Sequence, residues 1–446
     1  MSNEPRIMGK EFGKVVTRFA PSPTGLLHSG NYRTAFFSYL YARQNRGKFV
    51  LRIEDTDRER FKQEYADNIF ESLEWLGLEY DNQGDVPLQS ERGEVYKKYL
   101  QKLLDENKAY ISKEEIKKEG DKSEVIRFRN PNKVVTFRDI IRGDISMDTT
   151  DLKDFIIAKS ISEPVFHVAV VVDDYEMGVT HIVRGEDHIS NTPRQILIME
   201  AIGAPIPYYA HLPLVLAMDR TKLSKRKGAL ALTEYRDRGY LAEAILNYMA
   251  LLGWNPGTNE ELLFKSEMIE KFDLAKVQKG AAIFDEEKLK WFNREHLKKL
   301  SDADFLIRAS RFLPVNWSNG KEKILGKIIP RIRERVSTLG EVGELERIGE
   351  LSYFFDQPKY TKELLRSQEF LVGLIDIISA IGGDDFNAQK IKGAIWDFAT
   401  EKGRGNVLWP MRVALSGKEK SPDPFTIAEI LGKDETLSRL RHAKEL

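Results

Sequence analysis

Two short groups of residues carry side chains suited to holding a polyphosphate. His28 and Gly30 follow the proline-rich segment 21–25 and are separated by one residue. A histidine can donate a hydrogen bond to a phosphate oxygen, and a glycine leaves room for close approach. Much later, the run Lys-Leu-Ser-Lys-Arg-Lys at 222–227 places four cations within six residues. Together they indicate a site that binds a nucleoside triphosphate and stabilises the charge of departing pyrophosphate.

We expect three of these residues to act in catalysis: His28, Lys222 and Lys225. The expected ATP-binding set is His28, Gly30, Asn31, Lys222, Ser224, Lys225 and Arg226. Taken alone, His28 and Gly30 are typical of a surface loop. The basic run at 222–227, taken alone, is typical of a solvated basic turn or a nonspecific nucleic-acid patch. The position of the first group between a strand and a helix favours the nucleotide site.

The residues around His28 predict a βαβ unit. The expected elements are a strand at 15–20, a helix at 31–43, a strand at 49–53 and a helix at 63–76 stopped by Gly77. Such alternation is typical of a parallel sheet, whose carboxyl edge binds ligands.

The same pattern resumes in the middle of the chain. We expect strands at 166–172, 179–183 and 211–217, and a helix at 191–202. Asp173 and Asp174 are interpreted as part of a tight turn with no chemical role. Between the two parts, 81–163 is polar and irregular and is interpreted as an insertion with short strands, one of them at 134–137.

Composition restricts the class of protein. The chain has 446 residues, 41% of them hydrophobic, with 69 Lys plus Arg and 69 Asp plus Glu, so we expect several domains and only local basic surfaces. The absence of cysteine excludes disulfides, thiol nucleophiles and thiolate zinc sites. The first residues lack the apolar core of a signal peptide, and no run approaches the ~18 apolar residues of a membrane span. We therefore expect a cytoplasmic protein without membrane contact.

Four segments resemble a known family. Residues 17–33 resemble the first signature of class I aminoacyl-tRNA synthetases, and the Pro-Ser-Pro-Thr-Gly form is similar to that of bacterial glutamyl-tRNA synthetases. The run at 222–227 resembles the second signature. Arg-Ile-Glu-Asp-Thr-Asp at 52–57 and Val-Arg-Gly-Glu-Asp-His at 183–188 also match that family. The resemblance continues through 405–417 and so covers nearly the whole chain.

The resemblance implies an activity and its partners. The chain would activate L-glutamate with ATP and Mg²⁺ to glutamyl-adenylate, and pass glutamate to the terminal adenosine of tRNA(Glu), with activation requiring bound tRNA. The residues that would contact glutamate are Arg18, Ser22, Glu54, Phe166 and Arg184. These types suit a ligand with one ammonium and two carboxylates. We expect a monomer, and the sequence leaves open whether tRNA(Gln) is a second substrate.

The resemblance also implies a division of the chain. The fold class would be α/β, with a Rossmann-like catalytic domain formed by 1–80 and 164–228 and interrupted by an inserted α+β connective domain at 81–163. A stem-contact region at 229–300 and an all-helical anticodon-binding region at 301–446 would follow. Within the last region, Lys323, Lys327, Arg331 and Arg335 recur every fourth residue. They are candidates for binding tRNA phosphates, although a solvated helix face explains them equally well.

Three positions depart from the family pattern. Ser29 replaces the usual aliphatic residue, and Phe166 replaces a frequent tyrosine, so one hydrogen bond to substrate is lost unless His167 compensates for it. Some relatives carry a zinc knuckle near 109–112, which this cysteine-free chain cannot build, so no structural zinc is expected.

Other interpretations stay open at this point. Glutaminyl-tRNA synthetase is the nearest alternative, but its first signature differs and its carboxy-terminal half is rich in β-structure. A noncatalytic tRNA-binding paralogue has no need for intact His28, Gly30, Lys222 and Lys225. A small-metabolite nucleotidylyltransferase shares the His-x-Gly chemistry but has no use for a long helical extension.

Overall fold

The computed structural model describes residues 13–114, 123–221, 223, 230–314 and 322–446. The chain divides into two compact units: unit 1 is Met1–Asp237 with Leu241–Phe292, and unit 2 is Arg238–Tyr240 with Asn293–Leu446. Among the described residues, no helix is both long enough and apolar enough to cross a membrane.

Unit 1 begins with the βαβ unit expected from the sequence. Strand β1 (Val16–Phe19) leads into α1 (Ser29–Gln44), and β2 (Lys48–Leu51) returns parallel to β1. Helix α2 (Gln63–Leu76) then ends at Gly77, which has φ of 62°, a left-handed conformation that glycine adopts easily. These four elements confirm the prediction to within a few residues at each end.

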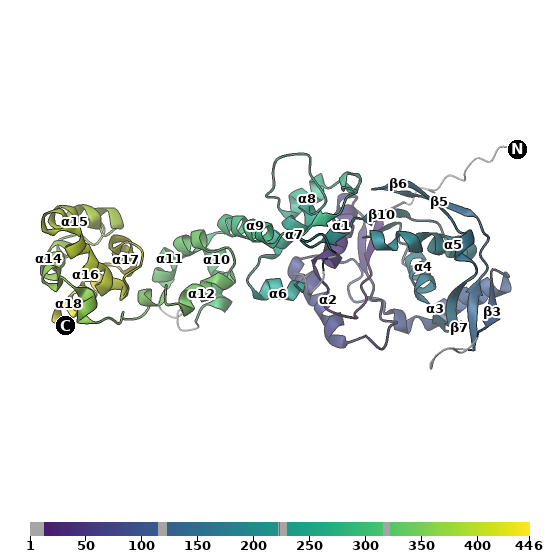
Figure 1. Cartoon of the computed structure of the whole chain (residues 1–446), viewed down its shortest axis with the longest axis horizontal. Coiled ribbons are helices and arrows are strands. Elements are labelled where there is room, and N and C mark those ends of the chain that lie inside the picture. Colours follow the sequence, from purple (N-terminus) through teal and green to yellow (C-terminus); the bar gives the residue numbers. More distant parts are fainter. Residues whose placement is uncertain (1–12, 115–122, 222, 224–229, 315–321) are drawn as a thin grey trace. The chain divides into compact units, whose positions relative to one another are not determined.

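A second sheet, next to the first, contains strands from later in the chain. Strand β9 (His181–Gly185) lies beside β1, where Thr180 N donates to Val16 O at 2.9 Å, and β10 (Tyr208–Leu212) pairs parallel with β9. On its other side, β10 pairs parallel with β5 (Val134–Asp139), which forms a hairpin with β6 (Gly143–Asp148). Strands from the expected insertion therefore complete the sheet that holds β10 (Figure 1).

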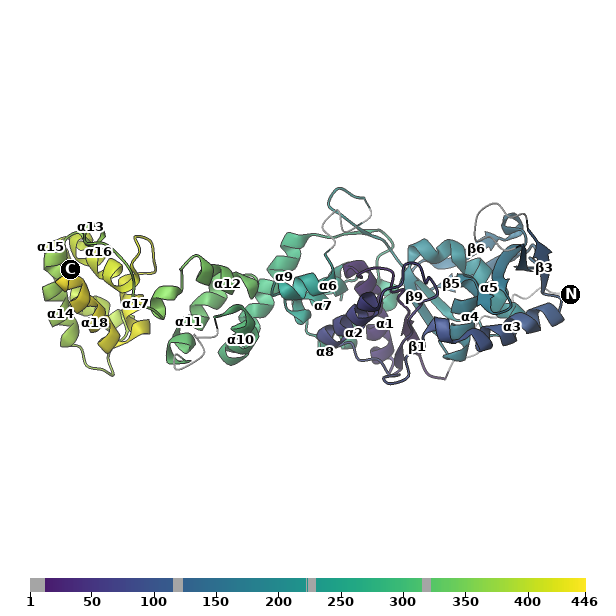
Figure 2. The same ribbon diagram turned by 90° about the horizontal axis from the view of Figure 1, so that it is seen from below.

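Residues 166–172 form a helix, so the strand predicted there is wrong. Helix α4 (Phe166–Glu176) packs against α5 (Thr192–Ile202), as both views show (Figures 1 and 2). Its consecutive residues Val168 to Val172 are all buried. A helix that is apolar on every side has no 3.6-residue periodicity, and its run of valines imitates a buried strand.

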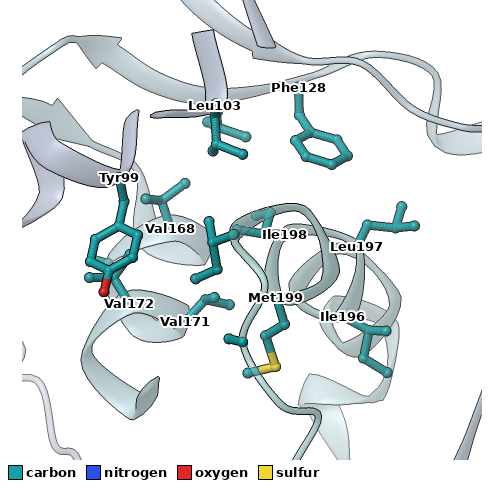
Figure 3. Packing of buried hydrophobic residues seen from close by; sticks show 14 of the residues in the cluster. Tyr99, Leu103, Phe128, Val168, Val171, Val172, Ile196, Leu197, Ile198 and Met199 are labelled. Carbon is teal, nitrogen blue, oxygen red and sulfur yellow. The ribbon is translucent and has the colours of Figure 1, made fainter. Parts of the chain in front are cut away.

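Helices α4 and α5 share a core with the expected insertion. Helix α3 (Gly93–Asp105) and an antiparallel sheet of β3 (Ala109–Lys113), β4 (Glu124–Phe128), β7 (Phe155–Ser160) and β8 (Glu163–Pro164) pack on them. In Figure 3, Leu103 and Phe128 point toward Val168 and Ile198, and all four belong to one buried cluster.

The strand predicted at 211–217 is interrupted. Strand β10 ends at Leu212, and after Pro213 the short strand β11 (Val215–Leu216) pairs with β12 (Ala282–Ile283) instead. Proline lacks an N–H group, so it cannot donate to a continuing ladder. The remaining helices of unit 1 are α6 (Leu232–Asp237), α7 (Ala242–Leu251) and α8 (Lys265–Lys271).

The described part of unit 2 is helical. Helix α9 (Glu286–Lys299) crosses the boundary between the units. The helices that follow are α10 (Asp302–Ala309), α11 (Glu322–Arg335), α12 (Gly340–Arg347), α13 (Lys362–Leu365), α14 (Leu371–Ser379), α15 (Ala388–Lys402), α16 (Arg404–Ser416), α17 (Pro424–Leu431) and α18 (Lys433–Glu445).

Candidate functional site

A cavity of about 420 Å³ opens in unit 1 at the carboxyl ends of β1 and β9, beside the start of α1. This volume suits a small-molecule ligand. The lining includes predicted residues from both expected subsites: Arg18, Ser22, His28, Gly30, Asn31, Glu54, Phe166 and Arg184. Side chains chosen from separate sequence motifs therefore meet in one place.

His28 is the N-cap residue of α1, and its ring is held by the helix start. The backbone N–H of Gly30 donates to His28 Nδ1 at 3.1 Å, and His28 N donates to Asn31 Oδ1 at 3.2 Å. Because Nδ1 accepts, the proton of the neutral ring lies on Nε2. A Cβ at Gly30 would lie 3.0 Å from His28 Cε1, so this glycine makes room for the imidazole itself.

The second predicted motif lies almost wholly outside the described residues. Lys222, Ser224, Lys225 and Arg226 belong to the part of the chain that the structure does not describe. Two described residues of this region lie close to the first motif. Leu223 lines the cavity, and Ala231 forms an antiparallel bridge with His28. The chain thus enters and leaves the basic run next to the first motif.

Two of the lining residues, Arg18 and Glu54, belong to a buried network of ion pairs. Arg18 Nε lies 3.2 Å from Asp174 Oδ1, and Arg52 NH1 lies 2.8 Å from the same oxygen. The second terminal nitrogen of Arg52, NH2, lies 3.0 Å from Glu54 Oε1. Arg92 and Tyr96 bind Asp173 in turn, at 2.7 and 2.9 Å.

The network shows that the tight turn predicted for Asp173 and Asp174 is wrong, because both carboxylates are buried in the last turn of α4. Burial opposes ionisation of Asp174, but the positive charges of Arg18 and Arg52 outweigh it and lower its pKa. Burial raises the pKa of Glu54, while Arg52 and Arg18 act in the opposite direction. Asp174 therefore holds two arginines in place, one of which lines the cavity.

Arg184 differs from Arg18 in having only neutral partners. Its nitrogens donate to His211 Nε2 at 3.1 Å, to Gln195 Oε1 at 2.7 Å and to Thr192 Oγ1 at 2.7 Å. In the described part of the chain no carboxylate forms an ion pair with it, although its side chain is buried. Burial lowers the pKa of Arg184 to about 10. The cavity thus contains a guanidinium whose hydrogen-bond partners are neutral, while the carboxylates of Asp174 and Glu54 act on it without direct contact.

The aromatic end of the cavity contains Phe166, whose ring lies 5.9 Å from that of His188 between centroids. His167, proposed from the sequence to compensate for the missing hydroxyl, is not among the lining residues, whereas His188 is. Burial lowers the pKa of His188 to about 4, so its ring is neutral at pH 7. Sequence reasoning missed His188 because nothing marks it beyond the shared string at 183–188.

The comparisons with known proteins show the family of the chain. Residues 14–124 and 111–291 match the family model "tRNA synthetases class I (E and Q), catalytic domain", and residues 287–444 match "Anticodon binding domain". The glutamate-tRNA ligase of Aquifex aeolicus is 42% identical over 97% of this chain and 99% of its own length. The chain belongs to the glutamate-tRNA ligase family. A Sulfurihydrogenibium member of the family is 38% identical over 96% of this chain and 98% of its own length.

A solved structure from the glutamate-tRNA ligase family has the same fold. The Elizabethkingia meningosepticum ligase, crystallised in complex with its amino acid, superposes with a TM-score of 0.84 at 33% identity, covering 97% of this chain and 99% of that one. The predicted combination of an α/β catalytic region and a helical anticodon-binding region is confirmed. The boundaries predicted at 81–163 and 229–300 stay predictions.

Proposed function

We propose that this protein is a glutamate-tRNA ligase that activates L-glutamate with ATP and transfers it to the 3′-terminal adenosine of tRNA(Glu). The observation that carries the proposal is a single cavity with two kinds of group. His28 stands at the N-terminus of α1, and the guanidinium of Arg184, whose hydrogen-bond partners are neutral, stands at the end of β9. The first suits a polyphosphate and the second a carboxylate.

The amino acid would lie between β1, Glu54 and Arg184. The guanidinium groups of Arg184 and Arg18 would hold its carboxylates, Glu54 would accept its ammonium group, and Ser22 would add a hydrogen bond. Arg18 is partly neutralised by Asp174 at 3.2 Å, which supports Arg184 as the stronger carboxylate receptor.

ATP would bind with its phosphates at the start of α1. The α-carboxylate oxygen of glutamate would attack the α-phosphorus, and pyrophosphate would leave with the electron pair of the broken P–O bond. His28 and Lys225 would stabilise the departing charge, so the rate would come from positioning and electrostatics. Mg²⁺ would neutralise the charge of the triphosphate when bound.

Binding of tRNA is proposed to involve α11 in unit 2. The four predicted cations Lys323, Lys327, Arg331 and Arg335 lie on this helix, which continues through Pro330. The side chain of Lys323 lies outside the part that the structure describes. Two of these cations already contact α17, because Lys327 Nζ donates to Glu429 O at 2.7 Å and Arg331 lies 3.3 Å from the Glu429 carboxylate. Any tRNA phosphate would share them with Glu429.

Exchange of labelled pyrophosphate into ATP, with and without tRNA, tests the proposal. Glutamate should support exchange only when tRNA(Glu) is present, and glutamine should not. No exchange with any amino acid would identify a noncatalytic tRNA-binding paralogue, and exchange with glutamine would identify a glutaminyl-tRNA synthetase. Charging separate tRNA(Glu) and tRNA(Gln) would then show whether the second is also a substrate. We further propose a cytoplasmic monomer without structural zinc, to be checked by sedimentation and metal analysis.

A further inference from the structure

His211 connects Arg184 to a carboxylate that does not itself touch the arginine. Arg184 Nε donates to His211 Nε2 at 3.1 Å, and His211 Nδ1 lies 2.7 Å from Asp139 Oδ2. A guanidinium can only donate, so Nε2 must accept and the ring proton must lie on Nδ1, where Asp139 accepts it. The histidine is therefore in a single neutral tautomer.

The ring of His211 is fixed by its surroundings. It is fully buried and lies parallel to the ring of Tyr209, at 5.9 Å between centroids and 5° between planes. The ring of Phe137 packs against it at 6.1 Å. Burial lowers the pKa of His211, which favours the neutral form that the hydrogen bonds require.

Asp139 is held as firmly as the histidine. Its Oδ1 accepts from the backbone N–H groups of Ile141 at 2.9 Å and Arg142 at 2.8 Å, and its Oδ2 also accepts from His211 N at 2.9 Å. Burial opposes its ionisation, but the hydrogen bond from His211 and those from the backbone outweigh it and lower its pKa. Asp139 belongs to β5, so the segment between the two halves of the catalytic sheet supplies this anchor.

We propose that Asp139 and His211 are positioning residues for glutamate binding: Asp139 fixes the tautomer of His211, and His211 orients the guanidinium of Arg184 toward the cavity. The inference rests on the proposed function, in which Arg184 holds a carboxylate of glutamate. Gln195, Thr192 and the backbone carbonyl of His188 are further neutral acceptors around the same guanidinium.

The neutral histidine solves a conflict between orientation and charge. A carboxylate in direct contact would orient Arg184 but would neutralise it, as Asp174 does for Arg18 at 3.2 Å. An imidazole between the arginine and Asp139 gives a directed hydrogen bond and leaves the positive charge for the substrate. Loss of the Asp139 hydrogen bond would allow the other tautomer, in which Nε2 carries a proton that opposes Arg184 Nε.

The first experiment replaces the anchor and compares it with a matched exposed residue. Asp139→Asn should raise the KM for glutamate about tenfold or more, because the amide can donate to Nδ1 and select the wrong tautomer, while the KM for ATP stays within about twofold. Asp144→Asn, on the adjoining strand β6 with a 67% exposed side chain, should change neither value. Both variants are assayed as full-length protein with L-glutamate, ATP and tRNA.

The second experiment tests the histidine, first in two variants that keep Asp139 and then in a double variant. His211→Gln keeps an acceptor near the position of Nε2 and should hold the KM for glutamate within about threefold, whereas His211→Leu removes the acceptor and should raise it about tenfold. In the His211→Gln background, Asp139→Asn should add little, since no tautomer remains to be selected. If circular dichroism shows that Asp139→Asn does not fold, the comparison of His211→Gln with His211→Leu decides the question.

Two results would overturn the inference. One is a folded Asp139→Asn or His211→Leu protein whose KM for glutamate stays within about twofold of the parent. The other is an equal rise in the KM values for glutamate and ATP, which would show a general structural role. Failure of the proposed function looks different, because the unsubstituted protein would then show no glutamate-dependent exchange at all, and the inference would fall with it.

Discussion

Arg18 and Arg184 line the same cavity, but only Arg18 is ion-paired, at 3.2 Å from Asp174. Arg184→Gln should therefore raise the KM for glutamate by roughly 10- to 100-fold, because the hydrogen bonds it removes are to a charged group, and leave the KM for ATP nearly unchanged. The melting temperature should change little, because the substitution removes both the cost of a buried charge and the hydrogen bonds to His211, Gln195 and Thr192. Pyrophosphate exchange and thermal unfolding measure the two effects.

The control for that substitution is Arg138→Gln, on β5, whose side chain is 72% exposed. It should alter neither the KM for glutamate nor the melting temperature. An unchanged KM for glutamate in Arg184→Gln would contradict the view that its charge is reserved for a ligand.

Gly30→Ala should slow adenylate formation without a comparable change in glutamate affinity. The new Cβ would lie 3.0 Å from His28 Cε1, so the imidazole must move away from the phosphate position. We expect kcat to fall by roughly 100- to 1,000-fold, the range for loss of one stabilising donor. Gly280→Ala, where nothing lies within 4 Å of the new Cβ, is the matched control. Equal kcat values for the two variants would show that the close approach at Gly30 is unimportant.

His181 should make the folded state less stable in acid. Burial lowers its pKa from 6.5 to about 4, and its ring stacks on Tyr208 at 4.9 Å. Below pH 6.5 His181 is protonated in the unfolded chain but stays neutral in the folded protein. The free energy of unfolding therefore falls as the pH drops from 6.5 toward 4. At pH 5 the loss is on the order of 2 kcal/mol.

The variant His181→Phe keeps a ring at this position but cannot titrate. Its melting temperature should therefore fall less than that of the parent between pH 7 and pH 5. Parallel slopes for the two proteins would count against the shifted pKa.

The cations of α11 should be visible in the salt dependence of tRNA binding. A triple variant with Gln at Lys327, Arg331 and Arg335 should reduce the slope of log affinity against log salt by about 0.7 to 0.9 for each phosphate that is no longer neutralised. Glu429→Gln should strengthen binding, because it frees Arg331 from its ion pair at 3.3 Å. Unchanged slopes together with a lower melting temperature would assign the cations to the packing of unit 2.

Local signals in the sequence are enough to predict the βαβ unit and much of the cavity. Proline, glycine and capping positions around His28 act within a few residues, so the strand, the loop and the start of α1 follow from their order. The same holds for α11, where Leu325, Ile328, Ile329 and Ile332 are buried as their spacing predicts. Family resemblance assigns Arg18, Glu54 and Arg184 to the amino-acid pocket, and the structure brings them to one cavity.

Long-range features cannot be predicted in this way. The valine run in α4 has no period, and only the α5 and α3 side chains packed around it distinguish a buried helix from a buried strand. Asp173 and Asp174 resemble a turn in the sequence because their partners Arg52 and Arg92 are far away along the chain. The hydrogen bond between Asp139 and His211 spans 72 positions, and no local pattern announces it.

The pairing of β5 with β10 limits how this protein can be re-engineered. A chimera that exchanged 81–163 for the corresponding stretch of a distant homologue would also exchange a sheet edge, a share of the hydrophobic interior and the acidic neighbour of His211. Grafts that preserve Asp139 and the strand around it should retain amino-acid recognition. Grafts that replace 81–163 as a whole, Asp139 included, should lose amino-acid recognition even when every residue that lines the cavity is unchanged.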